Sequence, residues 1–187
     1  MHKGLEMKVD ANYRFIAAAQ EVTARIAQRQ QALAMYVTLT VSLLTALVAL
    51  HPNARASGLP VEWLVLGFPV ASICLAFLNY KTERALTNLR SFMATLERLD
   101  NAHEELPSYN TDPRWSQNAN SARRFHDYAS AMLVGAGNLI AIAAFSNIYS
   151  ERVSGFSPVV WLTGAVAVLC VLALLLNPRL SYRPAAT

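Results

Sequence analysis

The sequence contains few charged residues. Only 15% of its 187 residues are charged, whereas a soluble domain carries about 25%. Four runs contain no charged residue at all: residues 32–50, 63–80, 128–150 and 153–178. Each run holds a stretch near the roughly 20 residues that a helix needs to cross a bilayer. None alternates with the period of a strand, so the sequence predicts an all-α integral membrane protein with four transmembrane helices.

The four runs also lack Asp, Glu and His. Proton-coupled transporters usually place such a residue within the membrane. A small multidrug exporter has four spans too, but it needs a membrane carboxylate for coupling. The absence therefore argues against transport driven by protons.

Residues that would support catalysis or metal binding are missing as well. Cys74 and Cys170 both fall inside predicted spans, so a disulfide scaffold is not expected. His103 and His126 lack the spacing of a zinc site such as His-Glu-x-x-His. The sequence has no Gly-rich phosphate loop and no nucleophile elbow. We therefore expect no enzyme, no catalytic residue, no metal and no cofactor.

The basic residues that are present have a clear distribution. Fourteen of the sixteen Lys and Arg residues lie before the first run, between the second and third, or after the fourth. Only Arg55 and Arg152 lie in the two remaining loops. The positive-inside rule then places both termini and the central segment in the cytoplasm.

This topology divides the chain into five parts. Residues 1–30 are predicted to be an amphipathic stalk helix, 31–80 a first transmembrane hairpin, 81–127 a cytoplasmic helical region, 128–177 a second hairpin and 178–187 a tail. Within the central region we expect a helix over 81–106, a loop over 107–112 and a helix over 113–127. Asp112 as N-cap and Pro113 at the first helical position favour that last start.

Apolar residues in the 81–106 helix follow the 4,3 spacing of a heptad seam: Leu89, Phe92, Leu96 and Leu99. About three heptad repeats bury too little apolar surface to be stable by themselves. The seam is therefore predicted to pack on other stalks of the same chain or on another subunit. Because a single four-helix unit rarely encloses a useful pore, we expect a homo-oligomer in the membrane lipid.

A weak internal repeat relates the two halves at an offset of 98 residues. It aligns Ala24-Arg25 with Ala122-Arg123, Pro60-Val61-x-Trp63-Leu64 with Pro158-Val159-x-Trp161-Leu162, and Leu78-Asn79 with Leu176-Asn177. Duplication would give two hairpins of the same orientation. Alternatively, span starts on the outer side often look like Pro-x-x-Trp.

Uncharged polar residues mark two of the spans. Thr38, Ser42 and Thr45 share one helical face, and Asn138 lies in the third span. Such a stripe suits an ion path. It equally suits helix–helix hydrogen bonding, in which Ser, Thr and Asn hold spans together. These four residues are the pore-lining candidates, and both interpretations remain open here.

Arginines should gather near the inner membrane face, and Arg25, Arg29, Arg84, Arg123 and Arg124 are the ligand-binding candidates. Their default role is topology and attraction to anionic lipid. A more specific role is bidentate binding of an anionic ligand such as a nucleotide or oligonucleotide.

Residues 13–106 resemble the SLATT type of bacterial membrane domain. The matching features are a helix led by Tyr13-Arg14-Phe15-x-Ala17-Ala18, the pair Arg25 and Arg29 before a hydroxyl-bearing span, and Leu78-Asn79-Tyr80-Lys81 running into an amphipathic helix. The second hairpin departs from the two-span form of that family. The resemblance implies a pore-forming effector of antiviral defence in the bacterial inner membrane, controlled by the nucleotide product of a nucleotidyltransferase.

The leading hypothesis is therefore an oligomeric channel that a cytoplasmic ligand or partner gates and that depolarises the cell or arrests its growth. A non-conducting membrane scaffold that recruits a cytoplasmic partner is the first alternative. A holin-like lysis protein is the second.

Overall fold

The computed structural model of the chain describes residues 10–50, 61–99, 107–150 and 158–182, and the side chains it describes in the third range exclude 116–123. Strands are absent from these ranges. The elements are α1 (Ala11–Ala49), α2 (Glu62–Glu97), α4 (Pro113–Ile148), α5 (Pro158–Leu176) and the short 3₁₀ helix η3 (Asn177–Leu180).

All four α-helices are long and apolar enough to cross a membrane. The 39 residues of α1 and the 36 of α2 correspond to lengths of about 58 and 54 Å at 1.5 Å per residue. Both exceed the roughly 30 Å of a hydrocarbon core. In α4 the apolar section lies between Arg124 and Ile148. The prediction of an all-helical chain with four helices of spanning length is confirmed.

The start of α4 follows the capping signal in the sequence. Pro113 occupies the first turn, and the Asp112 carboxylate accepts a hydrogen bond of 2.9 Å from the backbone N–H of Arg114. This bond satisfies one of the N–H groups that a helix start leaves unpaired.

The helix predicted over 81–106 is part of α2, and α2 ends at Glu97. The Glu97 carboxylate accepts hydrogen bonds from the backbone N–H groups of Asn110 (3.0 Å) and Thr111 (3.2 Å). It thereby holds the loop before α4 against the end of α2. The predicted continuation over 100–106 lies outside the described residues.

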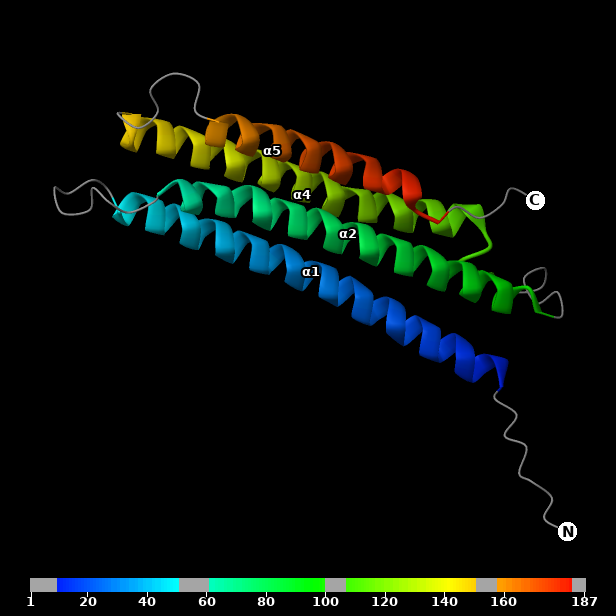
Figure 1. Cartoon of the computed structure of the whole chain (residues 1–187). Coiled ribbons are helices and arrows are strands. Elements are labelled where there is room, and N and C mark those ends of the chain that lie inside the picture. Colours follow the sequence, from blue (N-terminus) through cyan, green and yellow to red (C-terminus); the bar gives the residue numbers. More distant parts are fainter. Residues whose placement is uncertain (1–9, 51–60, 100–106, 151–157, 183–187) are drawn as a thin grey trace, which may run out of the picture.

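The helices lie roughly along one axis, with α1 at one edge of the molecule (Figure 1). α2 occupies the centre, where it packs against α1, α4 and α5. α1 buries the smallest share of its apolar section among the four helices. Among the described residues, one side of α1 is therefore largely exposed.

Two apolar clusters fill the interior. The first combines residues of all four helices, with Tyr36, Leu75, Val134 and Leu174 among its members. The second lies where α1 ends and α2 begins, around Phe145. There the Tyr149 hydroxyl donates to the carbonyl oxygens of Leu47 (3.1 Å) and Leu50 (2.7 Å), which ties the end of α1 to α4.

The offset of 98 residues also relates buried positions. From residue 29 onward, every buried residue of α1 has a buried counterpart in α4: Arg29 with Asp127, Tyr36 with Val134, Thr40 with Asn138, and Leu47 with Phe145. Between the second and fourth helices the match includes Ser72 with Cys170 and Asn79 with Asn177. The agreement between the buried positions of α1 and α4 favours duplication of a two-helix unit, although buried Ala71 and Leu75 of α2 correspond to exposed Leu169 and Ala173 of α5.

Candidate functional site

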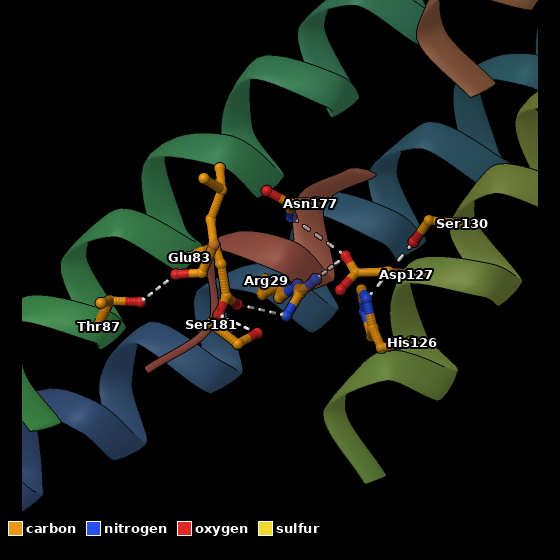
Figure 2. A network of polar contacts seen from close by, with 9 residues as sticks. Arg29, Glu83, Thr87, His126, Asp127, Ser130, Asn177 and Ser181 are labelled. Carbon is orange, nitrogen blue, oxygen red and sulfur yellow. Dashed lines mark hydrogen bonds and ion pairs between the residues drawn. The ribbon is translucent and has the colours of Figure 1, made fainter. Parts of the chain in front are cut away.

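A buried ion network lies where α1, α2 and α4 meet (Figure 2). The Arg29 guanidinium forms an ion pair with Asp127 and a second one, of 3.4 Å, with Glu83. None of these three side chains is more than 4% exposed. Burying a charge is costly unless it is paired and hydrogen bonded, so each residue depends on the other two.

The segment after α5 completes this network. Asn177 donates through Nδ2 to the Asp127 carboxylate (3.2 Å), and the Ser181 hydroxyl donates to Glu83 (2.9 Å). Thr87 donates to the carbonyl oxygen of Leu180 (3.0 Å). These contacts fix η3 and the residue after it against α2 (Figure 2).

The carboxylates of the network face a guanidinium and amide or hydroxyl donors. Beside them, the Ser130 hydroxyl lies 3.4 Å from Nδ1 of His126, one turn earlier on α4 (Figure 2). Within the described ranges, no group of three or more His, Cys, Asp or Glu side chains could hold a metal ion. What the arrangement does is lock three long helices and η3 at one level along the bundle.

The sequence indicated Arg29 as a ligand-binding candidate but did not indicate its partners, Glu83 and Asp127. Glu83 lies just beyond one charge-free run and Asp127 just before another, so each resembled an ordinary end-of-span charge. The available signal was the repeat, because an offset of 98 pairs Arg29 directly with Asp127.

A second polar contact lies in the apolar part of the bundle. Asn138 donates through Nδ2 to the Ser72 hydroxyl and to the Val134 carbonyl oxygen, both at 2.8 Å. The Tyr36 hydroxyl lies 3.4 Å from Ser72. Asn138 therefore faces protein, where it connects α4 to α2.

The three hydroxyl candidates of the first span lie elsewhere. Thr38, Ser42 and Thr45 are exposed on α1. Each donates to the carbonyl oxygen four residues earlier, at 3.0, 2.8 and 2.9 Å respectively. At 3.6 residues per turn they lie opposite the face that buries Tyr36 and Leu47. The structure groups these three and separates them from Asn138.

The face of α1 around these hydroxyls is uncharged from Ala24 to Ala49. Residues on its 4,3 stripe are Ala24, Gln28, Gln31, Met35, Thr38, Ser42, Thr45 and Ala49, all of them exposed. None is charged, and only Met35 is a large apolar residue. We call this stripe the neutral face of α1.

The candidate arginines do not form one cluster. Arg29 is enclosed by its carboxylates, whereas Arg84 and Arg124 are exposed. Arg25 forms an ion pair of 2.6 Å with Glu21, one turn earlier on α1. The Arg123 side chain lies outside the described part of the structure. Arg84 and Arg124 remain the candidates best placed to meet a ligand from solution.

The heptad seam is not the face that α2 buries within the chain. The buried residues beyond Glu83 are Leu86, Arg90, Met93 and Ala94. Leu89 and Leu96 are only half-buried, while Phe92 and Leu99 are 44% and 46% exposed. The buried face is thus displaced around the helix from the seam, and the described residues leave an apolar edge at Phe92 and Leu99 exposed.

Comparison with known proteins gives no match: no family model matches the chain, and neither a curated protein nor a solved structure shows significant similarity to it. The likeness of residues 13–106 to SLATT-type domains therefore depends on their motifs alone.

Proposed function

We propose that the chain is one subunit of an oligomeric ion-conducting protein of the bacterial inner membrane, with its path lined by the neutral face of α1. Two like-oriented hairpins would cross the membrane, and the long ends of α1, α2 and α4 would project into the cytoplasm as stalks. The observation that carries this proposal is the exposure of Thr38, Ser42 and Thr45 on the side of α1 turned away from the bundle.

In the described part of the chain, two apolar clusters and the Arg29 network occupy the interior of one subunit. A conducting path would therefore run between subunits, along a helix that each copy exposes. α1 fits that role because it is the least buried and carries an uncharged polar stripe.

Lipid is the competing neighbour of this face. A Ser or Thr hydroxyl bonded to its own backbone is tolerated in lipid, so three such residues do not decide the matter alone. Gln28 and Gln31 extend the stripe with amide groups, which favour water or protein as a neighbour. The apolar edge at Phe92 and Leu99 further favours a second copy against the stalks.

Gating would act through the continuous helices. A ligand that binds one arrangement of the stalks more tightly shifts the population toward that arrangement. Arg84 and Arg124 are exposed on two different stalks, and the SLATT resemblance suggests a nucleotide-type anion as the ligand. The resulting depolarisation or growth arrest would fit an effector of antiviral defence.

Cysteine accessibility tests the path directly. In a background with Cys74→Ala and Cys170→Ala, the variant Ser42→Cys is expressed in bacteria, and membrane potential is followed before and after a water-soluble thiol reagent. Expression should lower the potential, and modification of Ser42→Cys should restore it. Val37→Cys is the matched control, since it is also exposed on α1 but lies about 140° around the helix from Ser42.

Two outcomes would count against the channel. If neither expression nor reconstitution into liposomes dissipates a potential, the chain does not conduct. If Ser42→Cys and Val37→Cys respond alike, the neutral face does not line the path. The exposed Phe92 and Leu99 would then support the alternative, a non-conducting scaffold whose stalks recruit a cytoplasmic partner.

A further inference from the structure

A groove between α1 and α2 combines charged, amide and apolar groups. It encloses about 240 Å³. Arg25, Gln28 and Gln31 line it from α1, and Lys81 lines it from α2. Further along the same two helices it is lined by Met35 of α1 and Leu78 of α2, so one end of the groove is polar and the other apolar.

This groove straddles the point where both charge-free runs end. Gln31 immediately precedes the run 32–50, and Lys81 immediately follows the run 63–80. Met35 and Leu78 lie within those runs. In a membrane, the polar end would therefore lie at headgroup level and the apolar end beside acyl chains.

The polar end is arranged to receive an anion. Arg25 is held in place by Glu21, which accepts from Nε at 2.7 Å, and by the Gln28 side-chain oxygen, which accepts from Nη1 at 3.2 Å. Because that oxygen is occupied, the amide nitrogen of Gln28 is left to donate. Lys81 is exposed and forms no ion pair with any described residue.

We propose that this groove binds the phosphate group of an anionic glycerophospholipid. Arg25 and Lys81 hold the phosphate from two helices, Gln28 and Gln31 donate hydrogen bonds to its oxygens, and an acyl chain lies along Met35 and Leu78. The apolar end distinguishes a lipid from a free phosphate compound, because only a lipid uses both halves of the groove. The groove shares Gln28, Gln31 and Met35 with the neutral face, so a bound lipid would occupy one end of that face and leave Thr38, Ser42 and Thr45 for the proposed path.

Lipid retention measured by native mass spectrometry tests the groove. Protein in detergent is titrated with phosphatidylglycerol or with phosphatidylcholine of the same acyl chains. Wild type should retain phosphatidylglycerol more strongly. Since each cation near a membrane surface contributes about five-fold, the double variant Arg25→Gln, Lys81→Gln should lose about 25-fold in affinity. The control Arg98→Gln, Arg179→Gln removes the same charge from exposed residues outside the groove. This control variant should retain the wild-type affinity for phosphatidylglycerol.

A second variant is expected to bind more tightly, a result that misfolding would not produce. Glu21→Gln removes the carboxylate that competes for Arg25 and should tighten phosphatidylglycerol binding roughly two- to five-fold. Equal retention of the two lipids, or equal losses in the double variant and its control, would overturn the proposal. So would displacement of bound phosphatidylglycerol by millimolar inorganic phosphate or ADP, because the ligand would then be a free phosphate compound.

Discussion

Arg29 and Asp127 form a buried ion pair between α1 and α4 and are separated by 98 residues. Glu83 and Ser181, which are hydrogen bonded to each other beside that pair, have the same separation. Under the internal repeat each of these contacts therefore joins a residue to its own counterpart. Contacts between equivalent residues of two related units lie at the axis that relates the units. The Arg29–Asp127 and Glu83–Ser181 contacts would therefore mark this axis.

Removing the central cation should strongly destabilise the fold. Arg29→Met leaves Glu83 and Asp127 buried without their guanidinium, so the free energy of unfolding should fall by about 3–5 kcal/mol. Unfolding by SDS in mixed micelles measures this loss. The control Arg25→Met removes a partly exposed pair and should change stability by less than about 1 kcal/mol. Equal effects from the two variants would show that the network contributes little.

The two kinds of polar residue in the spans should respond differently to substitution. Asn138→Leu removes the partner of Ser72 in a buried site and should lower the free energy of unfolding by about 1–3 kcal/mol. Ser42→Ala removes an exposed hydroxyl bonded only to its own helix, so stability should change by less than about 0.5 kcal/mol. The same SDS titration compares them, and a large loss in Ser42→Ala would show that its hydroxyl has another partner.

Gly137 marks a close approach of α4 to α1. A Cβ atom added there would lie 3.2 Å from the Thr40 methyl and 3.3 Å from the Tyr36 hydroxyl. Both neighbours are buried, and a β-branched Thr is stiff, so neither moves aside easily. Gly137→Ala should therefore reduce stability by about 1–2 kcal/mol.

Gly164 provides the matched control for that substitution. A Cβ atom there would meet only Ile142, at 3.9 Å. Gly164→Ala should gain helix propensity and stabilise the protein by up to about 1 kcal/mol. Thermal melting of both variants in the same detergent checks the expected difference in sign.

The cap of α4 should weaken in acid. The Arg114 side chain and its backbone N–H hydrogen bond to Asp112 and lower the pKa of that carboxyl below its ordinary value. A carboxyl with a depressed pKa in the folded state stabilises that state above its unfolded pKa. The contribution is lost as pH falls through the folded pKa, here below about pH 4.

Amide exchange at Arg114, corrected for its intrinsic rate, measures this effect. Protection should be constant near neutral pH and decrease as pH falls below about 4, the ordinary pKa range of an Asp carboxyl. Asp112→Asn keeps a capping oxygen that does not titrate, so its protection should not depend on pH in that range. A wild-type profile that matches the Asn variant would exclude the carboxylate as the cap.

The helices could be predicted from the sequence because their signal is local. Charge-free runs, Asp112 before Pro113, and the spacing of Thr38, Ser42 and Thr45 each depend on neighbours along the chain. Which way a helical face points depends instead on the other helices. Spacing therefore grouped the three hydroxyls, but only the packed bundle shows that they point away from Asn138.

The stalk of α2 illustrates the same limit. An apolar pattern placed Leu89 and Phe92 on the seam, yet α2 buries Glu83, Leu86 and Arg90. A buried face that contains Glu and Arg cannot be recognised by hydrophobic spacing. It becomes recognisable only when Arg29 and Ser181 from distant segments are found beside it.

The separation of the network along the chain has a consequence for biosynthesis. Asp127 leaves the ribosome 98 residues after Arg29, and Ser181 the same number after Glu83. At synthesis rates of about 5 to 20 residues per second, each wait lasts roughly 5 to 20 s. During that interval α1 and α2 carry Arg29 and Glu83 without their later partners. Final packing of these two helices must therefore follow synthesis of α4 and of the segment after α5.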